Sequence, residues 1–445
     1  MSKKLIVLAI INSFVYADQY IYGKLVAGVE NKQFQNTSIP ITYGVIDYGS
    51  YFGIHGIEAI TPQANFIWQI EQFLDITLAK AYSNSVANGM LIPYDSLIAG
   101  KTATGVNQLA SSDSYIGIQS TWGMLRLGNL SSYLRSYMGA IDIFNYNSGY
   151  GANGLSIWSR TSANVVLPYS FMYNSSSWHG FTIGVDYTWD NLNNFGANTT
   201  VHKSYLGGNS QNGDYQSGIA SYGIAWQNGD FKINFASQLW NVVGVYPQTP
   251  PIAIAYNIPS NSSYSYAYVH RFEMSYNDPG GLYTAAGVQI TDGLGWSGWA
   301  NSGGAFNNYI VNQGYNYAGL SQAEYQTQEF ALSAGYHVGQ WMPKIAYSYG
   351  NNLMYGGSLG EVIQGTANQI ANSGYQQIVA ELDYTLTPRT LLFVNYGQIW
   401  YGATLQNISY CGINCNGGNP RANVNQVNQA FANQVSFAIG MSHVL

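Results

Sequence analysis

The feature that most constrains this chain is an alternation of apolar and polar residues at period two. In residues 64–71, ANFIWQIE, Phe66 and Trp68 fall on one face of an extended strand, and amide or acidic residues fall on the other. The same alternation occurs in residues 230–239 and continues in residues 435–445, up to the last residue. This period predicts β-strands that have one apolar face and one polar face.

The composition indicates that the apolar faces meet lipid. Only 8% of the residues are charged, whereas soluble domains contain about 25%. Aromatic residues make up 15% of the chain, which excludes a disordered protein. After residue 20, no run of 18 or more apolar residues occurs that could form a transmembrane helix. A transmembrane β-barrel interleaves lipid-facing and lumen-facing residues, so its mean hydropathy is near neutral, and the value here is −0.07.

The spacing of strands and loops supports the barrel over a soluble sandwich. Short turns alternate with long loops rich in Asn, Gly and Ser, as in outer-membrane barrels. Aromatic residues gather near strand ends, where a barrel has its aromatic girdles, at Trp158, Trp178, Trp189, Trp240, Tyr276, Trp341, Trp400 and Tyr401. We therefore expect an all-β, antiparallel transmembrane barrel of 16 strands, with 18 as the alternative. The strand candidates centre near residues 25, 45, 70, 117, 126, 168, 183, 222, 234, 270, 286, 330, 346, 380, 394 and 439.

Residues 1–17, MSKKLIVLAIINSFVYA, have the pattern of a secretory signal peptide. A basic start is followed by a short apolar segment and by small residues at a cleavage site before Asp18. A buried N-terminal strand is the alternative. We expect one domain, the barrel, over residues 18–445. Removal of Lys3 and Lys4 leaves 13 basic and 21 acidic residues, a net charge of −8. The sequence contains no tract of basic residues of the kind that binds nucleic acid.

The two cysteines, Cys411 and Cys415, lie in CGINC. In an exported chain, we expect them to form a disulfide that closes a small loop. A metal site is the alternative, but no His lies nearby to complete four ligands. Matches to G-x-G-x-x-G at 149–154 and to G-x-S-x-G at 356–360 lack the strand and helix context that those motifs need. With 50 glycines, chance matches are expected, and we expect no cofactor and no metal.

Several segments resemble the trimeric general porins of Gram-negative bacteria, particularly the neisserial type. The similar segments are 18–30 (DQYIYGKLVAGVE), 47–58 (DYGSYFGIHGIE), 64–72 (ANFIWQIEQ), 114–129 (SYIGIQSTWGMLRLGN), 377–392 and the closing SFAIGMSHVL. The resemblance implies a homotrimeric, non-enzymatic channel of 16-stranded barrels in the lipid of the outer membrane. It also implies that the barrel-assembly machinery reads the C-terminal strand. The third outer loop, roughly 130–162, is then expected to fold into the lumen.

Four positions depart from the porin pattern. Tyr51 and His55 stand where the family has basic residues, and Asn129 stands where it has Arg. These three positions belong to the family's basic wall, which faces the inward loop. Leu445 stands where the family ends in Phe, so the terminal residue differs in kind but stays apolar. The resemblance therefore implies a wall that is more aromatic and less charged than in the family.

Strand parity predicts which residues line the lumen. The residues expected at the pore lining or constriction are Lys24, Tyr51, His55, Glu71, Arg126, Arg135, Asp142 and Arg160, the last three on or beside the inward loop. Parity adds Asp75, Lys232, Arg271, Glu273 and Lys344. The structural alternative is that Lys24 and Arg126 pair with carboxylates on neighbouring strands. For His55, a solvated residue without functional titration is favoured over a pH-dependent charge.

Three functions are consistent with the sequence. The first is passive diffusion of small hydrophilic solutes and ions, with the −8 charge giving a weak cation preference. The second is a porin that prefers neutral solutes such as sugars, whose faces stack on aromatic rings. The third is an adhesin or enzyme on a barrel scaffold. His179 and His202 lie near loops, but no catalytic partner for either can be argued from the sequence.

Overall fold

The computed structural model describes residues 18–35, 41–74, 76, 110, 112–144, 158, 166–191, 216–243, 265–292, 325–355, 359–403, 409–410, 428–429 and 433–445. Within these residues the chain forms a closed antiparallel barrel of sixteen strands rather than eighteen. The strands are β1 (Asp18–Phe34), β3 (Tyr51–Thr61), β4 (Ala64–Phe73), β5 (Ser114–Ser120), β6 (Gly123–Ser131), β7 (Val166–Ser175), β8 (Phe181–Asn191), β9 (Gln216–Asn228), β10 (Phe231–Val243), β11 (Ser265–Asn277), β12 (Leu282–Asp292), β13 (Tyr325–Tyr336), β14 (Trp341–Gly350), β17 (Tyr375–Thr387), β18 (Thr390–Tyr401) and β21 (Gln434–Val444).

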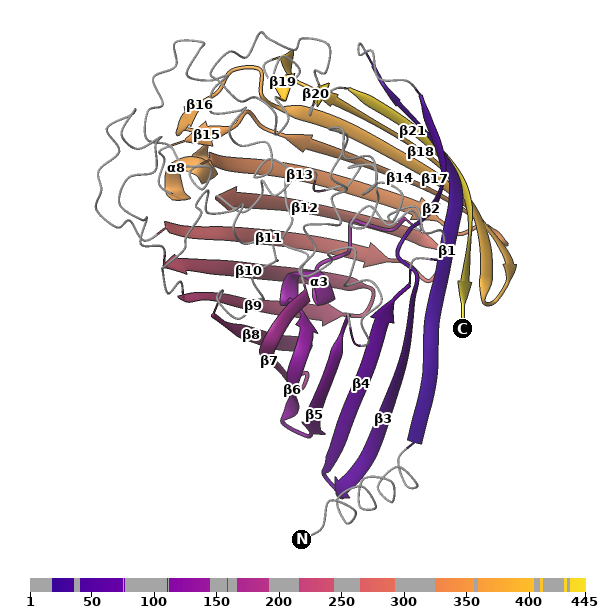
Figure 1. Cartoon of the computed structure of the whole chain (residues 1–445), viewed down its shortest axis with the longest axis vertical. Helices are drawn as coiled ribbons and strands as arrows, with labels where there is room; N and C mark the ends of the chain where they lie inside the picture. Colours follow the sequence, from indigo (N-terminus) through magenta and orange to yellow (C-terminus); the bar gives the residue numbers. More distant parts are fainter. Residues whose placement is uncertain are drawn as a thin grey trace.

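The first and last strands close the barrel. β1 pairs with β3 along one edge, where Tyr22 lies opposite Gly53. Along its other edge β1 pairs with β21, where Val29 lies opposite Ile439. In Figure 1 the yellow C-terminal strand β21 returns to lie beside the indigo β1. Closure pairs both edges of the sheet, which a barrel needs because lipid cannot satisfy unpaired backbone groups.

The second barrel strand is interrupted, which corrects the expectation of one strand centred near residue 45. β2 (Thr42–Asp47) and β3 both pair with β1, and residues 48–50 separate them. The Asp47 carboxylate accepts hydrogen bonds from the backbone N–H groups of Gly49 (2.7 Å) and Ser50 (2.8 Å). Gly49 adopts φ 104°, which favours glycine. The turn inserts one extra residue into the strand, because Asp47 lies opposite Ala27 and Tyr51 lies opposite Lys24.

Connections at the two ends of the barrel differ in length. At one end, two to five residues join consecutive strands, and Gly229 (φ 57°) and Gly339 (φ 59°) supply left-handed turn conformations. The other end carries the long connections, as the sequence predicted. Short elements lie in these connections: α3 (Tyr133–Tyr137), β15 (Met354–Tyr355), α8 (Leu359–Gln364), β16 (Asn368–Gln369), β19 (Ser409–Tyr410) and β20 (Asn428–Gln429). Among the described residues, no α-helix is long and apolar enough to cross a membrane.

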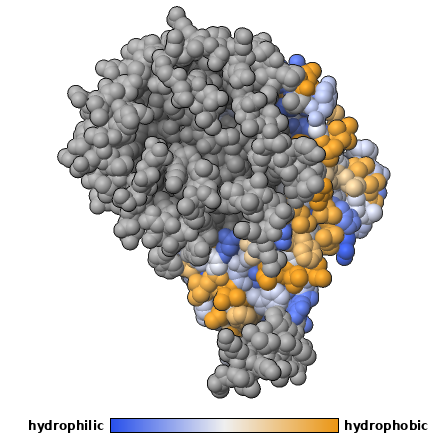
Figure 2. Space-filling view, in the orientation of Figure 1, coloured by the Kyte–Doolittle hydropathy of each residue, from blue (hydrophilic) through white to orange (hydrophobic). Residues whose placement is uncertain are grey.

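The wall has one exposed apolar face and one shielded polar face. In β14, exposed Trp341, Ile345 and Tyr347 alternate with buried Lys344 and Ser348. Apolar side chains gather on the part of the wall visible in Figure 2. Because large exposed apolar surfaces are rare on soluble proteins, this face is the lipid-facing one and the polar face lines the interior.

The expected aromatic girdle is confirmed only in part. Trp178, Tyr276, Trp341 and Trp400 are exposed at strand ends or in a turn. Trp158 was wrongly placed in the girdle, because its side chain is only 5% exposed and its ring lies near the guanidinium of an inner-wall arginine, described below. Tyr401 was also wrongly placed. It is the register partner of the inward-facing Tyr375, with ring centroids 6.4 Å apart.

Candidate functional site

The candidate site is the inner face of the barrel together with residues 132–144, which follow β6. The helix α3 begins at this point because Ser132 caps it, its Oγ accepting a hydrogen bond from the Arg135 backbone N–H (3.3 Å). The Tyr133 N–H donates to the Asp186 carboxylate on β8 (2.8 Å). The second of these hydrogen bonds attaches the first turn of α3 to the inner wall. Figure 1 shows where α3 follows β6 in the chain.

Two glycines on the inner wall accommodate the Tyr133 ring. Gly184 on β8 and Gly223 on β9 lie under this ring, and a Cβ at either position would overlap it. The Tyr133 hydroxyl donates to the Asn234 side chain on β10 (3.4 Å). Burial raises the pKa of Tyr133 to about 12, so the hydroxyl stays protonated at neutral pH. The ring is therefore a specific anchor for α3.

The next residues are fixed by charged side chains on β11. The Ala140 N–H donates to the Glu273 carboxylate (3.0 Å). Arg271 donates to the Met138 carbonyl (3.4 Å). Tyr283 on β12 donates through its hydroxyl to the Ala140 carbonyl (2.5 Å). Residues 138–140 thus follow the inner wall from β11 to β12.

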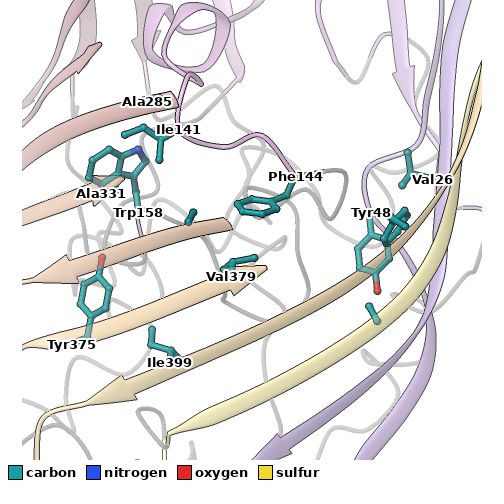
Figure 3. Packing of buried hydrophobic residues seen from close by; sticks show 13 residues of the cluster. Val26, Tyr48, Ile141, Phe144, Trp158, Ala285, Ala331, Tyr375, Val379 and Ile399 are labelled. Carbon is teal, nitrogen blue, oxygen red and sulfur yellow. The ribbon is translucent and has the colours of Figure 1, made fainter. Parts of the chain in front are cut away.

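Arg271 also joins several other groups in the interior. Its guanidinium donates twice to Gln289 Oε1 (2.8 and 2.6 Å) and lies 5.1 Å from the centroid of the Trp158 ring. Gln289 in turn donates to Glu329 (2.7 Å), which accepts from the Tyr375 hydroxyl (2.5 Å). Figure 3 shows Trp158 near Ile141 and Ala285, within one packed cluster of buried residues. A buried cation with this many partners is a structural clamp.

The residues predicted on β1, β3 and β4 all lie on the inner face. Tyr51 is the register partner of Lys24. His55 stacks on the ring of Tyr20, with centroids 5.1 Å apart. Glu71 accepts a hydrogen bond from the Tyr22 hydroxyl (2.9 Å). The structure therefore brings the four predicted residues of these strands onto one continuous wall.

Arg126 on β6 also points inward, whereas Asn129 has the parity of the exposed Leu127; each is held by neutral groups. Arg126 Nη2 donates to the Asn174 side chain (2.9 Å) and contacts the Met172 sulfur (2.6 Å). The described hydrogen bonds of Arg126 therefore go to neutral groups. They do not show the alternative, a pairing with a carboxylate on a neighbouring strand. Asn129 donates to the Ser112 carbonyl (2.9 Å) and thereby holds the end of the preceding loop.

Arg135 and Asp142 lie on the segment that crosses the interior. The Arg135 guanidinium lies 5.3 Å from the centroid of the Phe73 ring on β4. Asp142 interacts electrostatically with Lys24 on β1. Asp75, Arg160, Cys411 and Cys415 lie outside the described residues, so the expected disulfide and the expected role of Arg160 stay predictions.

A buried charge cluster was missed in the sequence. Lys344 on β14 contacts Glu381 (3.0 Å) and Asp383 (2.5 Å) on β17, and all three side chains are at most 7% exposed. Asn395 on β18 donates to Glu381 (3.1 Å). Parity would have found these acids, because Glu381 and Asp383 alternate with outward residues in YQQIVAELDYTLT. No group of three or more potential metal ligands occurs in the described part of the chain.

Comparison with known proteins agrees with this architecture. The model of the Gram-negative porin family matches residues 5–404. The major outer membrane protein P.IA of Neisseria meningitidis serogroup C is 24% identical over 425 residues, covering 89% of this chain and 93% of the relative. Protein P.IB of Neisseria meningitidis serogroup B is 25% identical over 411 residues, covering 90% and 94%.

Solved porin structures share the fold. An anion-selective porin from Comamonas acidovorans superposes with a TM-score of 0.56 at 14% identity, covering 96% of this chain and all of that one. The OmpF protein of Salmonella typhi, in complex with daunomycin, gives a TM-score of 0.54 at 13% identity, covering 96% and 97%. With the family match over most of the chain, the closed 16-stranded barrel and the polar inner face, the protein belongs to the Gram-negative porin family and is a channel of the bacterial outer membrane.

Proposed function

We propose that the channel allows passive diffusion of small hydrophilic solutes and ions, with a weak preference for cations. The observation that carries this proposal is a closed barrel whose inner face carries polar and charged side chains on strands all around the wall, beside one apolar cluster, from Lys24 on β1 to Ser436 on β21. A pore of this kind selects solutes by its width and by its lining charge. It needs no covalent chemistry, so we propose no enzymatic activity.

The pore lining is proposed to include the predicted residues Lys24, Tyr51, His55, Glu71, Arg126, Arg135, Asp142 and Arg160. The excess of acidic over basic residues, 21 against 15 in the whole chain, supports the cation preference. The Lys344 cluster adds to it, because one lysine faces two carboxylates there. The Comamonas porin is described as anion-selective, but at 14% identity its selectivity is not transferable to this chain.

The assembled form is proposed to be a homotrimer that is exported by residues 1–17 and inserted by the barrel-assembly machinery through β21. OmpT, an outer membrane protein of Vibrio cholerae, has been solved in a trimer form (TM-score 0.50, 11% identity). In this chain the residues of β21 pair with both β1 and β18, so this strand completes the wall. The mature protein is proposed to consist of residues 18–445.

Liposome swelling tests the proposed diffusion. Purified protein in liposomes should admit neutral solutes at rates that fall smoothly as solute size increases, because a water-filled pore sieves by width. Protein-free liposomes are the control. Correctly folded barrels that give no swelling even with the smallest solute would contradict passive diffusion.

A further inference from the structure

Four aromatic rings form a continuous row on the inner faces of β1 and β3, which we call the aromatic row. Its members, in order, are Tyr51, Tyr22, His55 and Tyr20. The ring centroids are 6.1 Å apart from Tyr51 to Tyr22, 5.4 Å from Tyr22 to His55, and 5.1 Å from His55 to Tyr20. Each ring therefore contacts the next, across two strands rather than along one.

The strand register explains why the row is continuous. Tyr20 lies opposite His55 and Tyr22 lies opposite Gly53. Because Gly53 has no side chain, the Tyr22 ring can lie across it, in the space that a Cβ would occupy. From there it reaches the rings of both Tyr51 and His55. A glycine covered by a cross-strand ring is a known device of β-sheets.

The aromatic row is accessible from the interior. Tyr20 is 50% exposed, and the other three rings are half-buried. Other inward tyrosines differ: Tyr133 and Tyr375 are each 2% exposed. Tyr133 and Tyr375 are packed against other residues of the protein. The rings of the aromatic row, in contrast, have surface that a solute can contact.

Polar groups on the next strands border the aromatic row. The Glu71 carboxylate accepts from the Tyr22 hydroxyl (2.9 Å) and from the Ser112 hydroxyl (2.5 Å). On β5, the Tyr115 hydroxyl donates to the Gln69 side chain (3.4 Å). The Arg126 guanidinium lies 5.2 Å from the centroid of the Tyr115 ring. The carboxylate and the amide of β4 thus lie beside the row and offer acceptors and donors, and the guanidinium of Arg126 lies further along the same wall, on β6.

We propose that the aromatic row is a binding strip for neutral sugars passing through the channel. A pyranose ring has an apolar face that can cover an aromatic ring and a rim of hydroxyl groups that needs hydrogen-bond partners. The row supplies the first, and the side chains of Glu71 and Gln69 supply the second. This proposal rests on the proposed open channel and adds a class of preferred solute to it.

The charges beside the row favour a neutral solute over an organic cation. An aromatic surface beside a carboxylate also attracts cations. Here, however, Glu71 already accepts two hydrogen bonds, and the guanidinium of Arg126 lies on the same wall two strands away. The negative charge of Glu71 and the positive charge of Arg126 offset each other, so this part of the wall favours neither cations nor anions.

Block of single channels by sugar tests the proposal. The full-length protein is recorded in planar bilayers in KCl while maltotriose is added to one side at millimolar concentrations. We expect a saturable, concentration-dependent block. Polyethylene glycol of similar size is the comparator, because it displaces water but has no ring face to stack, and it should give only the unsaturated decrease due to its volume.

Two variants locate the strip. Tyr51→Leu and Tyr20→Leu each remove one ring, and each should raise the half-blocking sugar concentration by roughly tenfold, the equivalent of about 1.4 kcal/mol. Tyr222→Leu is the matched control. Tyr222 is 41% exposed on the outer face of β9, so its replacement should leave the block unchanged. If one of the two variants fails to form channels, the other still shows whether the aromatic row binds the sugar.

Three results would overturn the inference while leaving the open channel intact. These are a sugar effect no greater than that of polyethylene glycol, the same half-blocking concentration in the row variants as in the parent, and block by tetramethylammonium but not by sugar. The proposed channel function fails in a different way, through the absence of KCl conductance from the parent protein.

Discussion

At the scale of single residues, the absence of a side chain at Gly223 determines where the interior segment lies. The Tyr133 ring fills the space above this glycine. We predict that Gly223→Ala moves α3 away from β9 and changes the single-channel conductance. The barrel itself should still form, because alanine is acceptable in a strand and glycine has no conformational advantage there. Single-channel recording together with the thermal unfolding temperature checks both statements.

Gly44→Ala is the matched control for this prediction. Gly44 lies on β2, and a Cβ there would meet only the Ile46 Cδ1, at an ordinary contact distance of 3.5 Å. Its replacement should leave the conductance at the parent value. If Gly223→Ala also conducted like the parent, the Tyr133 anchor would not control the shape of the interior.

The buried charge cluster gives a second prediction at this scale. Lys344→Met leaves the Glu381 and Asp383 carboxylates without their cation. Breaking a buried ion pair costs about 3–5 kcal/mol, and the wall becomes more negative by one charge. We therefore expect a lower free energy of unfolding and a zero-current potential shifted towards potassium selectivity.

The double variant Lys344→Met with Glu381→Gln controls for charge. It restores the net charge of the parent cluster without restoring the ion pair. Its ion selectivity should return to that of the parent, although some stability remains lost. If Lys344→Met left the selectivity unchanged, the cluster would lie too far from the ion path to contribute to it.

At the scale of elements, Arg271 on β11 fixes residues 138–140 and Trp158 to the wall. We predict that Arg271→Met loosens this segment, because both the hydrogen bond to Met138 and the contact with the Trp158 ring are lost. The expected result is frequent brief closures or substates in single-channel records. Arg389→Met, which removes an exposed cation from the short turn between β17 and β18, is the control and should give no additional closures or substates. Equal noise in the two variants would contradict a specific clamp.

The sequence predicts the strands much better than it predicts the contacts inside the barrel. Alternation is a local signal, so it located the strand near residue 234, the short turns and the inward position of Lys344. The break after Asp47 could have been suspected from Gly49, but not placed. Contacts such as Tyr133 with Gly223, or Arg271 with Trp158, join residues about 90 to 113 positions apart. No local pattern encodes such contacts, which explains why Trp158 was assigned to the girdle.

At the scale of the whole molecule, the outer face is apolar, and many of the charged residues that the structure describes lie on the inner wall, among them Lys24, Arg271 and Lys344. At three positions where the resemblance to porins predicts basic residues, this chain has Tyr51 and His55 in the aromatic row and Asn129 in a loop contact. Several of the other cationic side chains on the inner wall are bound to neighbouring groups of the protein. Arg271 holds an interior segment and Lys344 is paired with two acids. The combination favours a channel that discriminates weakly between ions.

Single-channel recording of the purified protein in a KCl gradient tests this account most directly. We expect large, ohmic, open steps that appear in groups of three, with a small zero-current potential of the sign that indicates potassium preference. The steps follow from an open barrel in a trimer, and the small potential follows from described inner-wall cations that are held by neighbouring groups, such as Arg271 and Lys344. Folded barrels without conductance, or a zero-current potential that indicates chloride preference, would contradict the account.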